Sequence, residues 1–166
     1  MTPSASLSVQ IAAPAGSNFD LSSLFDMVVD GGPLMVLAVA GDMVLMPAFS
    51  ARDALEQSGI RVRIVSIASP RRLYPPGDLG WNTVSEPDGR FMDDETFAGL
   101  FHGDALLAIS GGPSATLEPV LLRSSVRRDV LCWQRGETVA SPAELMHFNG
   151  VDAPTIEARA KALLGL

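Results

Sequence analysis

Hydrophobic residues in this chain gather in short unbroken runs, and these runs predict the strands of a sheet. The run at 34–40, LMVLAVA, contains no polar residue. Such a run is typical of a strand that is covered on both faces, as in a parallel sheet. Similar segments predict three further strands at 61–68, 105–110 and 129–134. We therefore expect a buried and largely parallel sheet.

Helical patterns fill the intervals between these runs. In residues 43–59 the apolar positions follow helical spacing, Pro47 suits the first turn and Gly59 ends the helix. Asp93 is placed to cap a second, acidic helix start. The helix that Asp93 caps is expected at 94–101, and further helices are expected at 117–126, 142–148 and 153–165. Strands that alternate with helices indicate an α/β sandwich.

The length of 166 residues suits one domain. Residues 1–18 mix Ser, Ala and Pro without a clear period, so we assign them to a flexible arm or linker and 19–166 to the α/β domain. Residues 69–90 are rich in proline and glycine, as in functional loops or interfaces of compact domains. Within this insertion we expect an exposed apolar surface around Leu73, Tyr74 and Trp81.

Charge and cysteine content narrow the classes of partner and compartment. The formal net charge of −7 argues against binding to nucleic acid or to anionic membranes, which would repel such a surface. No apolar run reaches the length of a membrane helix, and the first basic residue is Arg52, so we expect no secretory signal. The single cysteine, Cys132, fits a reducing compartment. We therefore expect a cytoplasmic protein.

The segment 106–121, LLAISGGPSATLEPVL, is the most ligand-like stretch of the chain. A glycine turn between a strand and a helix can present backbone N–H groups to a phosphate. Gly111 and Gly112, however, belong to neither a dinucleotide fingerprint nor a P-loop, and no lysine follows them. Pro113 also lacks an N–H donor. We therefore interpret the turn as a tight corner rather than a phosphate cradle.

Three further residues are candidates for ligand or interface contacts. Asp42 follows the first long strand, where open α/β sheets often bind ligands, and its carboxylate would favour a hydroxyl or a cation. The alternative is an aspartate that bonds its own turn. Arg71 and Arg72 lie in the proline-rich insertion and could form a contact surface, the alternative being a solvated loop.

Catalytic groups are not evident in the sequence. Cys132 could be a nucleophile only beside a base, and neither His102 nor His147 stands in a recognisable pattern with it or in metal-ligand spacing. No G-x-S-x-G elbow occurs. The acidic run 93–95 is explained by its place at a helix start. From the residues alone we expect an α/β domain without catalytic machinery of its own.

Five pieces of the chain, taken in order, resemble the C-terminal domain of phosphoketolases, which are thiamine-diphosphate enzymes that cleave sugar phosphates to acetyl phosphate. MVLAVAGD is similar to that family's VVLACAGD, IRVRIVSI to LKVRFVNV, and DDETFAGLF to SDEEFDALF. LLAISGGP stands where the family has a strand that ends in HGYP, and GETVASPAELMHFN is similar to EGTTTTPFDMVVLN. Ser110 and Gly112 replace the family's His and Tyr, so the roles of those side chains do not carry over.

This resemblance implies a three-layer α/β sandwich with a mixed, mostly parallel five-stranded sheet, as in transketolase C-terminal domains. It implies a structural and oligomerisation role, with thiamine diphosphate and a divalent metal bound by partner domains or a partner subunit. The possible ligand or interface loops are those of Asp42, Arg71, Arg72, Ser110, Gly111 and Gly112. Two alternatives stay open, namely a C-terminal domain of a transketolase-type enzyme and a stand-alone module that binds a small ligand.

Overall fold

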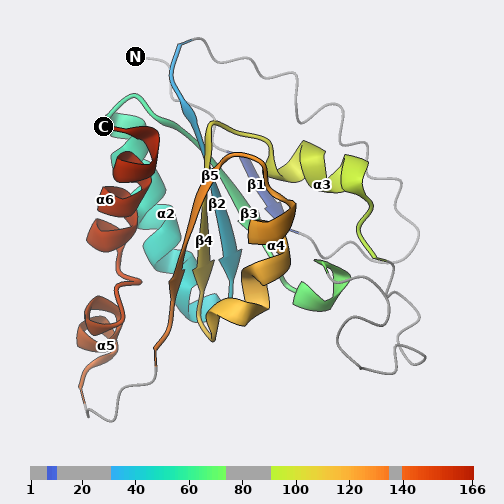
Figure 1. The fold of residues 1–166 in the computed structure, drawn as a ribbon. Helices are drawn as coiled ribbons and strands as arrows, with labels where there is room; N and C mark the ends of the chain where they lie inside the picture. Colours follow the sequence, from blue (N-terminus) through green and yellow to red (C-terminus); the bar gives the residue numbers. More distant parts are fainter. Residues whose placement is uncertain (1–6, 11–30, 74–90, 135–139) are drawn as a thin grey trace.

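The computed structural model describes residues 7–10, 31–73, 91–134 and 140–166. Its sheet has the strand order β1-β3-β2-β4-β5. Figure 1 shows the strands β1 (Leu7–Gln10), β2 (Leu34–Ala40), β3 (Arg61–Ser66), β4 (Ala105–Ser110) and β5 (Arg127–Cys132). The helices are α2 (Asp42–Gln57), η1 (Pro70–Leu73), α3 (Asp94–Phe101), η3 (Ser114–Leu117), α4 (Glu118–Arg123), α5 (Pro142–Phe148) and α6 (Ala153–Leu164).

We expected a mixed sheet of five strands, and its mixed character needs correction. Every described pairing is parallel. The reason is that helices carry the chain across a face of the sheet between β2, β3, β4 and β5, so each strand starts again at the same end. These four strands form the body of the sheet. β1 adds a four-residue segment beside β3, within the stretch 1–18 that we assigned to an arm.

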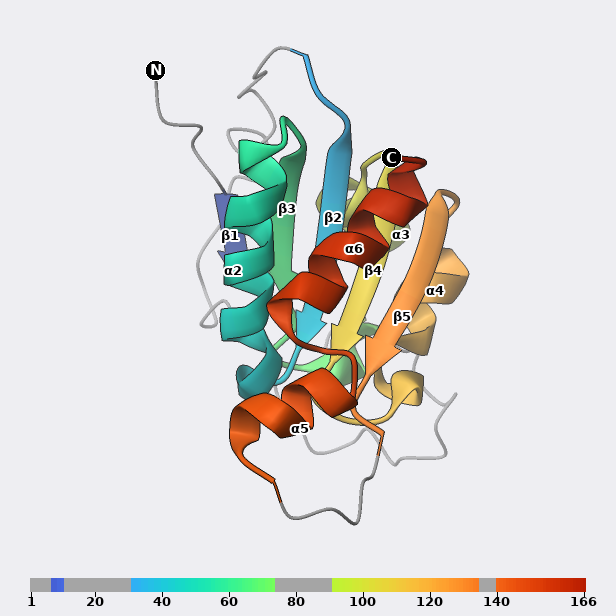
Figure 2. The ribbon, with the colours of Figure 1, turned by 90° about the vertical axis from the view of Figure 1, so that its left-hand side faces the viewer.

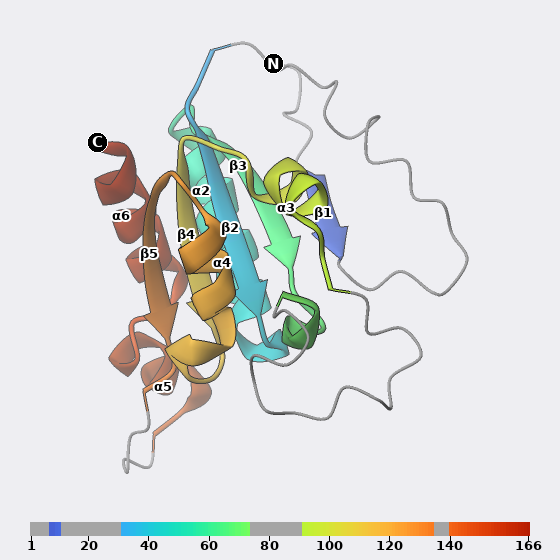
Figure 3. The same ribbon diagram turned by 45° about the vertical axis from the view of Figure 1, so that its right-hand side comes forward.

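The register of the sheet places two apolar layers on its faces. On β2, Met35 and Leu37 pack toward α2 and α6, whereas the intervening Val36 packs toward α3 and α4. Figure 2 shows α2 and α6 side by side over one face, and Figure 3 shows α3 and α4 over the other. β2 and β4 are therefore covered on both sides, as their unbroken apolar runs predicted. The expected α/β sandwich is confirmed.

The ends of the helices follow the capping residues in the sequence. The side chain of Asp93 accepts a hydrogen bond from Thr96 N, which begins α3 as expected. Ser141 and Glu144 form a reciprocal capping box at the start of α5. Gly165, with φ of 79°, ends α6 in the left-handed conformation. None of the described helices is long and apolar enough to cross a membrane.

Two sequence expectations on the α3/α4 side of the sheet are wrong. The helix expected over 117–126 ends at Arg123, because Ser124 is extended and the chain enters β5 at Arg127, two residues earlier than predicted. Leu73, expected on an exposed apolar surface, is only 1% exposed because η1 turns it into the core beside α3. The other two residues of that surface lie outside the described part of the chain.

Candidate functional site

Two tight corners meet where β2 and β4 end, and glycine is required at their contact. Gly41 has φ of 108°, a conformation that L side chains rarely adopt. A Cβ atom on Gly41 would lie 3.3 Å from the Cα atom of Gly111. Gly111 N donates to the carbonyl oxygen of Ala40 at 2.8 Å, which ties one corner to the other. A side chain at Gly41 would therefore strain the backbone and press on Gly111, whereas a Cβ atom on Gly111 would make only ordinary van der Waals contacts.

The backbone donors of the glycine turn already have acceptors. Gly111 N is bonded to Ala40, and Gly112 N donates to Oγ of Ser110 at 3.1 Å. The Ser110 hydroxyl, which is completely buried, donates in turn to the carbonyl oxygen of Pro113 at 3.3 Å. Pro113 has no N–H group. The geometry therefore agrees with a corner, because neither glycine has a donor left for a phosphate.

Asp42 lies on the exposed rim of this corner as the first residue of α2. Gly41 is the N-cap residue, and Asp42 is the acidic residue in the first turn of α2. An acidic residue there interacts favourably with the partial positive charge of the helix N-terminus. This structural role accounts for Asp42, and its role in binding a hydroxyl or a cation stays a prediction.

Arg71 and Arg72 lie on η1, which follows β3 and so belongs to the same end of the sheet. The backbone of Arg72 is fixed on both sides, because its N–H donates to Ser69 and its carbonyl oxygen accepts from Met92 N at 2.8 Å. The Arg72 side chain is partly buried, and that of Arg71 lies outside the described part of the chain. The structure thus brings the candidate loops to one end of the sheet without showing a shared ligand.

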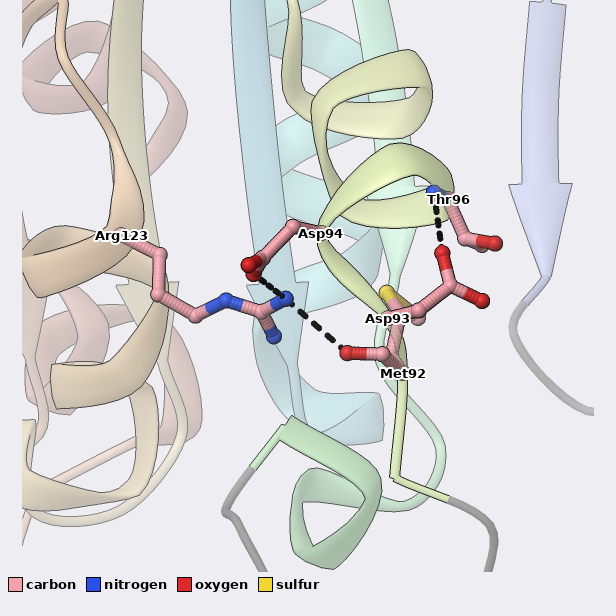
Figure 4. A network of polar contacts seen from close by, with 5 residues as sticks. All are labelled: Met92, Asp93, Asp94, Thr96 and Arg123. Atoms are coloured by element: carbon pink, nitrogen blue, oxygen red, sulfur yellow. Dashed lines mark hydrogen bonds and ion pairs between the residues drawn. The ribbon is translucent and has the colours of Figure 1, made fainter.

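Sequence analysis missed a polar network between α3 and α4, which Figure 4 shows. Nη2 of Arg123 donates to Oδ1 of Asp94 at 2.6 Å and to the carbonyl oxygen of Met92 at 2.9 Å. The guanidinium carbon lies 4.2 Å from the centre of the Phe97 ring. The sequence attributes the acidic run 93–95 to the helix start alone. That holds for Asp93, whereas Asp94 pairs with a residue 29 positions away.

The remaining titratable candidates, His147 and Cys132, lie on different elements of the fold. Nδ1 of His147 lies 2.8 Å from Oδ2 of Asp152, at the junction of α5 and α6. Partial burial raises the pKa of Asp152, but hydrogen bonds from Thr155 and His147 outweigh it and hold that pKa below its usual range. Cys132 ends β5 and is partly buried. In the described part of the chain, no three His, Cys, Asp or Glu residues are arranged to hold a metal ion.

Comparisons with known proteins include a sequence relative and a structural neighbour that bear on the family. No family model matches the chain. It is 25% identical over 133 residues to a probable phosphoketolase of Bifidobacterium animalis subsp. lactis (strain AD011), covering 78% of this chain and 15% of that protein. A split gene transketolase, described as an inactive beta4 tetramer, aligns with a TM-score of 0.55 and 20% identity, covering 82% of this chain and 41% of the other.

These findings support the resemblance to a phosphoketolase/transketolase C-terminal-like domain. The sequence relative is a phosphoketolase, and the structural neighbour shares the α/β fold with its parallel sheet. The chain spans less than a sixth of the phosphoketolase and under half of the transketolase chain. What those proteins do as wholes therefore enters only as a proposal for this chain.

Proposed function

We propose that this chain is the C-terminal-type domain, or a separate subunit of that type, of a thiamine-diphosphate-dependent phosphoketolase-like enzyme that acts on ketose phosphates. Its role is structural, because it packs against the domains that carry the cofactor and mediates contacts between subunits. The single observation that carries the proposal is the match to a phosphoketolase over 133 residues. A cytoplasmic location, where carbohydrate metabolism takes place, belongs to the same proposal.

The separate-subunit form of the proposal has support in the structural comparison. The neighbour's description names a split gene and an inactive beta4 tetramer, so in that enzyme one piece exists as its own chain and assembles with copies of itself. The chain described here covers 41% of that piece. If this chain is likewise one part of an enzyme that is divided into separate chains, it is inactive until it joins a partner that binds the cofactor.

The glycine turn, the described segment that most resembles a phosphate site, does not fit the diphosphate of the cofactor. A diphosphate needs free N–H donors, and both N–H groups of the Gly111–Gly112 turn are bonded within the protein. A divalent cation needs several oxygen ligands, and the described chain offers no group of three candidate ligands. In this proposal the cofactor and metal belong to the partner domains, and no chemical step is assigned to this chain.

Calorimetric titration of the full chain with thiamine diphosphate and Mg²⁺ tests this assignment. We expect no heat above that of dilution, and no conversion of xylulose 5-phosphate by the chain alone. Addition of a thiamine-binding chain should then restore turnover if this chain is a separate subunit. Micromolar binding of the cofactor, or turnover by the lone chain, would contradict the proposal.

The same reconstituted system separates the phosphoketolase from the transketolase alternative. A phosphoketolase consumes inorganic phosphate and releases acetyl phosphate, whereas a transketolase transfers a two-carbon unit to an aldose acceptor. Acetyl phosphate that forms only when phosphate is present would support the first assignment. Product formation that requires an aldose acceptor instead would assign the chain to a transketolase-type enzyme, which has the same fold.

A stand-alone ligand-binding module remains the second candidate, because Asp42 and the Gly111 corner share the strand end where open α/β sheets bind ligands. A thermal-shift screen with sugar phosphates and nucleotides tests it. A ligand present at 100 times its dissociation constant stabilises the folded state by about 2.7 kcal/mol, which is a measurable shift. The occupied backbone donors argue against anions, so we expect no shift with phosphorylated ligands.

A further inference from the structure

α5 (Pro142–Phe148) differs from every other described helix, because none of its seven residues is buried. The other described helices all contain buried residues. In α5, Leu145 and Met146 are half-buried and Phe148 is 69% exposed. Figure 2 shows α5 beyond the ends of the strands, where it does not lie over the sheet. A helix this short is not stable in water by itself, so α5 depends on its attachments to the rest of the fold.

One side chain, that of Asn149, ties the end of α5 to the chain that leaves β5. Its Oδ1 atom accepts a hydrogen bond from Gln134 N at 2.7 Å, and its Nδ2 atom donates to the carbonyl oxygen of Leu145 at 2.7 Å. Within the described residues, the bond to Gln134 is the one hydrogen bond that joins 141–149 to an earlier segment of the chain. Met146 adds a partly buried contact with the apolar cluster on the α2/α6 face. α5 is therefore held by few contacts, and Asn149 supplies the polar one.

A glycine separates α5 from the firmly packed chain that follows. Gly150 has φ of 66°, and the next residue, Val151, is completely buried. Hinges in proteins are often a few small residues at the end of an element, which absorb the change in backbone angles. The pair of His147 and Asp152 spans this glycine, but the His147 side chain is 79% exposed, so the pair contributes little stability. Rotation at Gly150 can therefore move α5 while α6 stays in place.

We propose that α5 is a hinged cover that opens at Gly150 while the rest of the domain stays folded, and that the bond between Asn149 and Gln134 is its latch. Segments with few buried contacts open at a lower free energy than the whole fold. Opening withdraws Met146 from the apolar cluster against which Trp133, the neighbour of Gln134, also packs. It therefore enlarges the apolar surface at this end of the molecule and controls how much of it a partner can contact. This device does not depend on the proposed role as an enzyme domain.

Hydrogen exchange of the full chain, measured by mass spectrometry, tests the proposal. We expect the amides of residues 145–149 to exchange at least about tenfold faster, relative to their intrinsic rates, than those of residues 156–164 in α6. They should still exchange more slowly than the amides of an unstructured chain, because α5 is closed most of the time. Equal protection of the two helices, or no protection of α5 at all, would overturn the proposal.

Asn149→Ala removes the latch and separates local opening from loss of the whole fold. Loss of the Gln134 bond should speed the exchange of residues 145–149 by about fivefold, while β4 keeps its protection and the melting temperature is unchanged. Ser58→Ala is the matched control, because Ser58 Oγ donates to the carbonyl oxygen of Ala54 at the end of α2 without reaching another element. This control should leave the exchange of α5 unchanged. Unchanged exchange of α5 in Asn149→Ala, or an increase that also appears in β4 or in the control, would overturn the proposal.

Discussion

Nη1 of Arg63, on β3, donates a hydrogen bond to the carbonyl oxygen of His102, the residue that ends α3, at 3.2 Å. The same atom also reaches the carbonyl oxygens of Gly99 and Leu100. These carbonyl groups belong to the end of a helix, where no further N–H group of the helix can satisfy them. Arg63 thus joins the sheet to α3. Burial, together with the charge of Arg61, lowers the pKa of Arg63.

Replacement of Arg63 by methionine should destabilise the fold by about 1–3 kcal/mol, because the carbonyl groups at the end of α3 lose a charged donor. Urea unfolding followed by circular dichroism measures the change. Arg159→Met is the matched control, since Arg159 is 52% exposed and pairs with Asp129 at the surface. The control should cost less than about 1 kcal/mol. Equal losses for the two variants would contradict a capping role of Arg63.

The corner of β2 and β4 predicts different costs for two glycine substitutions. Gly41→Ala should destabilise the protein by about 2–3 kcal/mol, because the backbone is in a region that suits glycine and the new Cβ meets Gly111. Gly59 has a φ of 79°, closer to the left-handed region that other residues tolerate, and no atom lies within 4 Å of a Cβ built on it. The cost of Gly59→Ala should be about 1 kcal/mol. Thermal unfolding compares the two, and a smaller loss for Gly41→Ala would contradict the close approach of the corners.

The cap of α3 predicts a loss of stability in acid. Hydrogen bonds from Thr96 hold the pKa of Asp93 below its usual range. The stabilisation by Asp93 is therefore complete above about pH 4 and is lost as the pH falls through the lowered pKa. Asp93→Asn keeps an N-cap side chain that does not titrate. Its stability relative to the wild type should rise as the pH falls from 5 to 2. A constant difference across this range would contradict the prediction.

The parts of the fold that the sequence predicts are those set by local pattern. The sequence predicts β4 with its observed bounds because residues 105–110 form a run without charge, and all six residues are buried in the structure. β5 was placed two residues late because it begins with Arg127 and Arg128, whose charges are tolerated where the strand is exposed. The pair of Arg123 and Asp94 left no local signal, because its partners are brought together only when α3 and α4 pack on the sheet.

The nature of the Gly111–Gly112 turn could be predicted in part from the sequence. The missing lysine and the presence of Pro113 already argued against a phosphate cradle. The sequence could not show that the hydroxyl of Ser110 accepts the N–H of Gly112, because that bond depends on the local turn. The expected exposure of Leu73 failed for a similar reason, since a short helix after β3 buries it.

Self-association is the last prediction, and it tests the oligomerisation role. Met46 on α2 and Phe148 on α5 are each 69% exposed, and Figure 2 shows α5 and the start of α2 at the same end of the molecule. A contiguous exposed apolar patch marks a contact surface, and we expect these two side chains to contribute to one. We expect the full chain to form oligomers at micromolar concentration in sedimentation velocity, and the double variant Met46→Glu and Phe148→Glu to be monomeric.

Leu122→Glu serves as the control for this experiment, because Leu122 is exposed on α4, over the opposite face of the sheet from α2. It adds one negative charge, half of what the double variant adds, to a chain whose net charge is already −7, so a general effect of charge repulsion would weaken association in both variants. If only the double variant dissociates, the contact between copies lies at the end of the molecule that carries α5 and the start of α2. A wild-type chain that stays monomeric at high concentration would contradict the proposed contact between copies.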